Sequence, residues 1–137
     1  MKNYFLYAFI LFSLHSISQI SYPQNITFHT RDESASYQDQ NGKIKYEQVS
    51  NQKGSYEIQI TKAAEVRNSP IIQIYGDNNE KGYYAFSSTF ENVKMGEKLF
   101  EANLFFSTAT NTGVKIYFAY DKSSLIIMSK NKVIRYY

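Results

Sequence analysis

The feature that most constrains this chain is the two-residue period of its apolar side chains. Residues 55–62, SYEIQITK, alternate apolar and polar side chains, which is typical of a strand with one buried face. Residues 113–120, GVKIYFAY, show the same alternation. The 3.6-residue apolar period of an amphipathic helix is missing, and only one or two helical turns are predicted, at Thr61–Val66. We therefore expect an all-β fold.

Less regular alternation predicts further strands, and turn-forming residues separate them. All six glycines fall between the predicted strands, where a tight turn can use their conformational freedom. Residues 39–42 and 76–82 are predicted to be hairpin loops, and residues 121–124 and 129–132 to be turns. The further strands are Asn25–Thr30, Ser34–Gln38, Lys43–Gln48, Pro70–Tyr75, Tyr83–Phe90, Lys98–Thr108, Leu125–Ser129 and Lys132–Tyr137.

These segments predict a small antiparallel meander of about 8–10 short strands, because short connections join antiparallel neighbours. A meander of this length has to protect its two edge strands. Closure or partial closure into a barrel achieves this, and the even, short connections favour it. Two stacked sheets forming a sandwich are the alternative.

The first 18 residues are predicted to be a secretory signal peptide. A short basic start is followed by the apolar run 4–14 and by Ser16 and Ser18, small residues that suit cleavage before Gln19. The apolar run is too short for a permanent membrane anchor, which needs roughly 20 residues. Residues 19–137 are then a single all-β domain, located in the periplasm or secreted. The abundance of residues with A/T-rich codons indicates a bacterial gene.

Charge and cysteine content exclude several classes of protein. Removing Lys2 from the 15 basic residues leaves 14, against 12 acidic residues, and no run of like charges occurs. Nucleic-acid binding is therefore not expected. The chain has no cysteine, so neither disulfide bonds nor a bacterial lipoprotein anchor is expected.

No catalytic constellation is visible, so the chain is not predicted to be an enzyme, and no cofactor or metal is expected. His29 is the one histidine after residue 18, too few for a zinc site and without an evident partner as a general base. The loop that begins at Asp77 resembles a calcium loop only faintly. Lys81 and Ser88 stand where that loop needs oxygen ligands, so a polar hairpin is expected.

Two further alternatives remain, both weaker. A hydrolase using paired carboxylates would find its candidates in Glu47 and Glu57, on strands predicted to be adjacent, or in Asp32–Glu33 or Glu97 with Glu101. An outer-membrane barrel would fit the aromatic C-terminus, but the predicted strands are mostly shorter than the 9–11 residues that such barrels need.

The remaining functional signal is a set of aromatic residues predicted to face away from the core. Phe105 is placed there because Phe100, Ala102, Leu104 and Phe106 share the other face of their strand. Tyr83 and Tyr117 are placed outward by the same reasoning. An exposed patch of Tyr83, Phe105 and Tyr117 would suit a protein interface.

The sequence thus predicts an exported, non-enzymatic β-domain that acts by binding. The leading hypothesis is a protein partner in the periplasm or extracellular space, as for an inhibitor or an immunity protein. The alternative is a carrier that holds a small apolar ligand inside the barrel.

Overall fold

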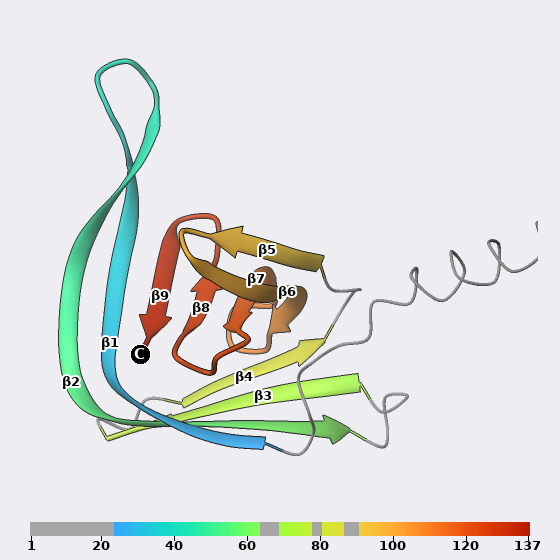
Figure 1. Ribbon diagram of the computed structural model, residues 1–137. Coiled ribbons are helices and arrows are strands. Elements are labelled where there is room, and N and C mark those ends of the chain that lie inside the picture. The colour runs from blue at the N-terminus through green and yellow to red at the C-terminus, as the bar shows by residue number, and fades with distance from the viewer. Residues whose placement is uncertain (1–23, 64–68, 78–80, 87–90) are drawn as a thin grey trace, which may run out of the picture.

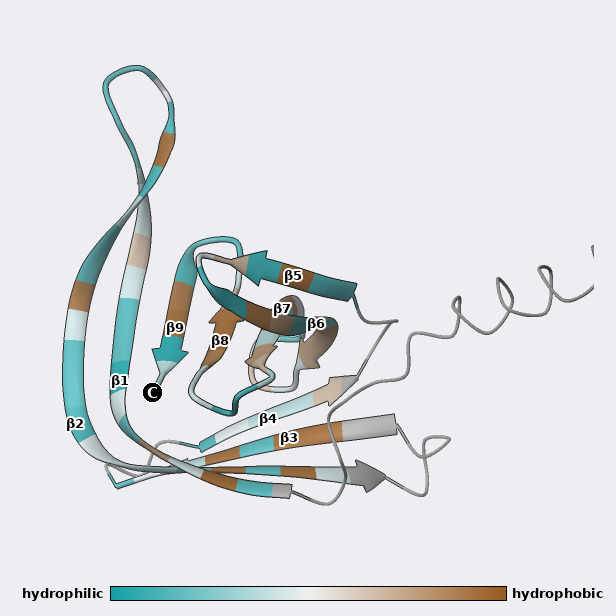
Figure 2. Cartoon of the chain, viewed as in Figure 1, coloured by the Kyte–Doolittle hydropathy of each residue, from teal (hydrophilic) through white to brown (hydrophobic). Residues whose placement is uncertain are grey.

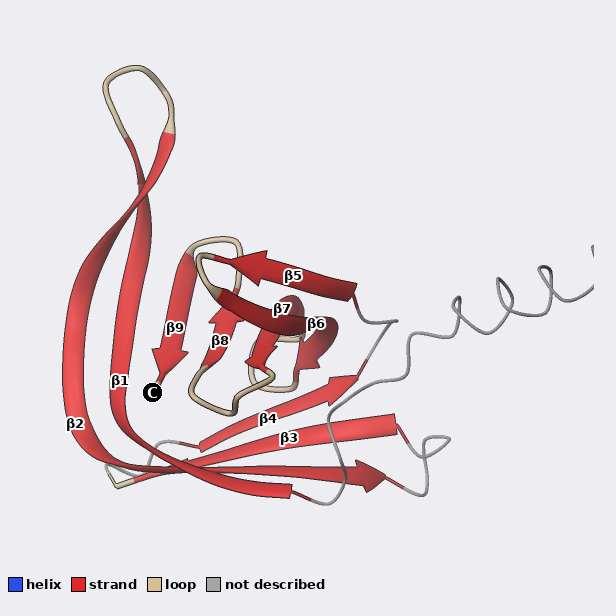
Figure 3. Cartoon of the chain, in the orientation of Figure 1, coloured by secondary structure: helices blue, strands red, loops and turns tan. Residues whose placement is uncertain are grey.

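The computed structural model describes residues 24–63, 69–77, 81–86 and 91–137, and among these it contains strands and no helix (Figure 3). The predicted signal peptide lies outside the described residues. In the predicted helix Thr61–Val66, residues 61–63 instead extend a strand, and residues 64–66 are not described. The strands are β1 (Gln24–Gln38), β2 (Ile44–Ala63), β3 (Ser69–Gly76), β4 (Lys81–Phe86), β5 (Glu91–Met95), β6 (Lys98–Ser107), β7 (Thr112–Ala119), β8 (Leu125–Met128) and β9 (Lys132–Tyr136).

The described strands form one antiparallel sheet that closes into an eight-stranded barrel. Its order is β4-β3-β2-β1-β9-β8-β7-β6, and β4 pairs with β6 to close the ring (Figure 1). The predicted all-β barrel is thereby confirmed. Closure pairs the edges that β4 and β6 would otherwise leave free. The ninth strand, β5, lies outside this ring and pairs with β6.

Strands β4 and β5 pair with successive parts of the same side of β6. Phe86 of β4 lies opposite Phe105, and Glu91 of β5 lies opposite Ala102. Strand β5 is not among the strands predicted from the sequence. Its five residues include only Val93 and Met95 as large apolar side chains, too few for a clear alternation.

The long strands β1 and β2 differ most from expectation, because four predicted short strands merge into two strands of 15 and 20 residues. Their pairing shifts register between Phe28 and Thr30 and again between Glu33 and Ser34, and each shift leaves one extra residue on β2. Such β-bulges bend and twist a strand without ending it. Gly54 lies at the first shift, where a Cβ atom would approach within 3.1 Å of Asp77 Oδ2.

The barrel interior is a continuous apolar core. Tyr56, Ile58 and Ile60 of β2 point inward, in agreement with the predicted alternation, and the rings of Tyr56 and Tyr136 lie 5.5 Å apart. In β7, Val114, Ile116 and Phe118 also point inward, in agreement with the predicted alternation. The buried members of this core are Phe28, Tyr56, Ile58, Ile60, Ile72, Ile74, Phe105, Val114, Ile116, Phe118, Leu125, Ile127 and Tyr136.

Strand β6 has the opposite orientation to the one predicted. Its inward face carries Glu101, Asn103 and Phe105, and Asn103 Nδ2 donates a hydrogen bond to Glu101 Oε1 at 3.3 Å. Its outward face carries Phe100 and Ala102, which belong to a second buried cluster on the outer side of the sheet. That cluster consists of Phe100, Ala102, Tyr117 and Ala119, with Val93, Met95, Ile126 and Met128 packed against it.

Candidate functional site

The predicted aromatic patch does not form at the surface. Tyr83 is exposed, at 39%, but Phe105 is only 2% exposed and belongs to the barrel core. Tyr117 does face outward as expected, yet it is only 9% exposed because it packs in the outer cluster. The expectation that these three side chains are exposed together is therefore wrong for Phe105 and Tyr117. Their predicted role in partner binding has no structural support.

The most prominent surface feature is instead the end of the β1–β2 hairpin, residues 36–49, which we call the arm. Pairing between β1 and β9 ends where Ala35 lies opposite Lys132, and one further hydrogen bond joins Ser36 N to Asn131 O at 2.9 Å. Beyond this point, residues 36–38 and 44–46 pair only with each other among the described residues, and residues 47–49 form the base of the arm beside the end of the β1–β9 pairing. Figure 1 shows the arm extending well beyond the rest of the described chain.

The tip of the arm is a well-defined turn centred on Asp39. Its Oδ1 accepts hydrogen bonds from the backbone N–H groups of Asn41 and Lys43, both at 2.9 Å, and Gly42 adopts a positive φ of 76°. The Lys43 N–H and the Lys45 ammonium group, 3.1 Å from Oδ2, hold the pKa of Asp39 below its ordinary value. The predicted hairpin loop at residues 39–42 is confirmed, and the tip is organised without any partner.

The arm carries large apolar side chains that its own chain leaves exposed. Ile44 is 63% exposed and Val49 57%, and Tyr37 and Tyr46 are each 47% exposed. Figure 2 shows isolated brown, hydrophobic bands on the β2 side of this hairpin, on a mostly hydrophilic ribbon. The sequence predicted a strand at Lys43–Gln48 but could not show that it leaves the barrel. Alternation identifies a two-faced strand and does not identify what covers its faces.

A pocket of about 270 Å³ opens at the barrel end beside the base of the arm. Its apolar side is formed by inward side chains of the barrel wall, among them Tyr84, Val114, Ile127 and Ile134. Turns at this end of the barrel complete the pocket. These turns and the adjoining strand ends add four hydroxyl groups, those of Ser107, Thr110, Thr112 and Ser129. Such a mixture of apolar wall and few polar groups is typical of small-molecule sites.

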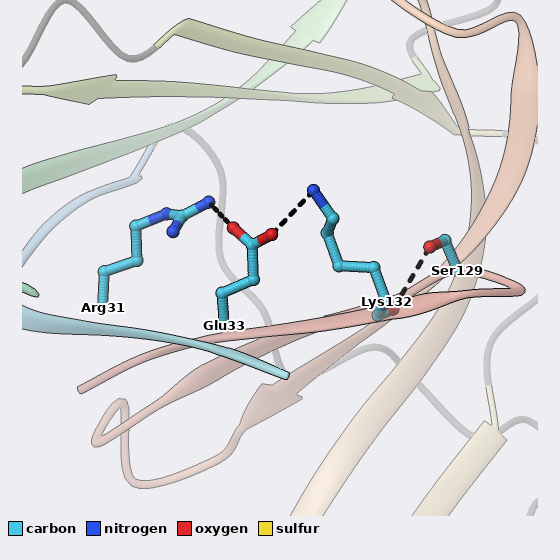
Figure 4. A network of polar contacts seen from close by, with 4 residues as sticks. All are labelled: Arg31, Glu33, Ser129 and Lys132. Atoms are coloured by element: carbon cyan, nitrogen blue, oxygen red, sulfur yellow. Dashed lines mark hydrogen bonds and ion pairs between the residues drawn. The ribbon is translucent and has the colours of Figure 1, made fainter. Parts of the chain in front are cut away.

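Lys132 at the rim of this pocket belongs to a charged network (Figure 4). The Lys132 ammonium group lies 2.8 Å from Glu33 Oε1, and Arg31 Nη2 lies 2.8 Å from Glu33 Oε2. The hydrogen bond from Lys132, supported by Arg31, holds the pKa of Glu33 below its usual value, although burial acts in the opposite direction. Two cations thus share the two oxygens of one carboxylate.

The carboxylate pairs considered for hydrolysis are separated. Glu47 and Glu57 lie ten positions apart on the same strand, β2, so the expectation that they face each other from adjacent strands is wrong. Asp32 and Glu33 are consecutive in β1, so they point to opposite faces, and Asp32 accepts a hydrogen bond from Asn51. Glu97 is exposed, whereas Glu101 is buried.

The remaining candidates for chemistry are isolated from one another. His29 is exposed on β1. Asp77 accepts a hydrogen bond from the backbone N–H of Ser55 at 2.7 Å. Residues 78–80, in the loop that begins at Asp77 and faintly resembles a calcium loop, lie outside the described residues. No group of three or more His, Cys, Asp or Glu side chains that could hold a metal occurs among the residues described.

No helix in the described ranges has the length and apolar character needed to cross a membrane. Comparison of the chain with protein-family models, with curated proteins and with solved structures finds no match.

Proposed function

We propose that this chain is an exported, non-enzymatic protein that acts by binding another protein through its arm. The observation that carries this proposal is the exposure of Ile44 and Tyr46 on a ribbon that projects from the barrel, with Val49 also exposed at its base. Exposed apolar side chains on a projecting element are typical of interaction surfaces, because burying them against a partner is favourable.

The order of the arm supports this role. Binding is weakened by the entropy lost when a mobile segment becomes ordered, and preorganisation reduces that loss. The Asp39 turn fixes the tip, and the pairing of β1 with β9 fixes the base. The arm therefore presents its side chains in a defined arrangement before any partner arrives.

The backbone of the arm offers a second means of contact. Strand β3 pairs with β2 only from Tyr56 onward, so the outer edge of β2 over residues 44–55 is unpaired within the described part of the chain. An extended segment of a partner could add to such an edge. The bulge at Val49 interrupts the edge, so side-chain contacts near the tip are expected to dominate.

The test is affinity capture of the tagged mature chain from the host envelope and culture medium, with quantification by mass spectrometry. We expect one partner in stoichiometric amount. Capture should fall at least tenfold for the double variant Ile44→Ser/Tyr46→Ser, because both side chains lie on the arm. The matched control Tyr83→Ser, on the barrel wall, should retain the partner. Equal capture by the arm variant, loss with Tyr83→Ser alone, or no retained protein would contradict the proposal.

A further inference from the structure

The pocket at the end of the barrel is a second candidate site, and it does not depend on the proposed role of the arm. Its volume of about 270 Å³ equals that of roughly nine water molecules. It therefore has room for a ligand on the order of ten non-hydrogen atoms. The side chains of Val114, Ile127 and Ile134 give it an apolar wall deep in the barrel.

The rim of the pocket provides a cation with spare hydrogen-bonding capacity. Lys132 has three ammonium N–H donors, and its contact with Glu33 Oε1 at 2.8 Å uses one of them. Its side chain is 48% exposed, so the group can reach a second acceptor. Arg31 contacts the other oxygen of Glu33 at 2.8 Å, so Lys132 is not the sole cation that neutralises this carboxylate.

We propose that this pocket binds a small amphiphilic carboxylate, of the size of a medium-chain fatty acid. The alkyl chain would lie against the apolar wall, and the carboxylate would accept hydrogen bonds from the remaining N–H donors of Lys132. A second donor is available from the pair of hydroxyls of Thr110 and Thr112, which lie 2.6 Å apart, because only one of the two donates to the other. The Ser129 hydroxyl is already used, since it donates to the Lys132 carbonyl at 3.1 Å. A neutral apolar ligand would offer no acceptor to the remaining donors of Lys132. The site thus favours an acid over an alcohol of equal length.

The experiment is isothermal titration calorimetry of the full chain with octanoate and with 1-octanol. We expect saturable octanoate binding in the millimolar range or tighter, and 1-octanol binding about tenfold weaker, since a charge-assisted hydrogen bond is lost. Lys132→Gln should weaken octanoate binding about tenfold and leave 1-octanol unchanged. Lys130→Gln is the matched control, because Lys130 lies in the same turn and does not line the pocket.

Two further variants keep the test valid if Lys132→Gln disturbs the fold. Glu33→Gln removes the anion that competes for Lys132, so octanoate should bind more tightly, by about threefold or more. Ala109→Trp, in the exposed turn at the rim, should block both ligands. The proposal is overturned if octanoate shows no saturable binding up to about 10 mM. Equal affinity for the two ligands, or unchanged octanoate binding in folded Lys132→Gln or Glu33→Gln, would also overturn it.

Discussion

At the scale of single residues, the neighbours Phe105 and Phe106 have opposite environments. Phe105 is 2% exposed inside the barrel, whereas Phe106 is 47% exposed on its outer wall. We expect Phe105→Ala to lower the free energy of unfolding by about 3–5 kcal/mol, the usual cost of removing a buried aromatic ring. Phe106→Ala should cost about 1 kcal/mol or less. Urea unfolding of both variants measures the difference, and a larger loss for Phe106→Ala would mean that β6 faces the other way.

The network around Glu33 predicts a pH dependence of stability. The folded state holds the pKa of Glu33 below its ordinary value of 4.5, so the contribution of its ion pairs is complete above that value. It is lost as the pH falls through the lowered folded-state pKa. Glu33→Gln should therefore lower the free energy of unfolding by about 1 kcal/mol at neutral pH. The gap between the two proteins should close as the pH falls below about 4.

Denaturant unfolding of both proteins across this pH range is the measurement. Glu91→Gln is the matched control, since Glu91 pairs with Lys115 at an exposed position on the outer wall. It should change the free energy of unfolding by less than about 0.5 kcal/mol. A Glu33→Gln difference that stayed constant down to pH 3, or grew, would contradict the assigned role of the ion pairs.

At the scale of the strand, the sequence predicted well which segments are strands. It predicted less well how long the strands are and which face of each one points into the barrel. The alternation in residues 55–62 and 113–120 identified the inward faces of β2 and β7 correctly. The predicted strands left gaps at residues 31–33 and 49–54. The strands continue through them because bulges absorb one extra residue of β2 at each register shift.

The orientation of β6 shows why one strand was assigned to the wrong face. Its apolar residues occupy both faces, and Phe100, Ala102, Leu104 and Phe106 outnumber Leu99 and Phe105. The inward position of Glu101 and Asn103 is stabilised by contacts, such as their mutual hydrogen bond, that form only in the fold. A count of the apolar residues on each face does not include these contacts.

At the scale of the whole molecule, barrel closure depends on the seam between β4 and β6. Within the described residues, β4 meets β6 at three residue pairs, from Tyr84 opposite Ser107 to Phe86 opposite Phe105. Closure could be predicted because a meander has to protect its edge strands. The strands that meet at the seam could not be predicted, because β4 and β6 are not consecutive in the chain. The site was less predictable than the fold. The pocket needs residues from five strands and two turns, and the arm is recognised only by its lack of neighbours.

We propose that the arm, and not the barrel wall, binds the partner. Amide hydrogen exchange, read by mass spectrometry on the chain alone and in complex with the captured partner, distinguishes the two surfaces. We expect new protection to be concentrated in residues 36–49, and Tyr83 and its neighbours on the wall to exchange as before. Protection concentrated on the wall around Tyr83 and Phe106, with an unchanged arm, would contradict the claim.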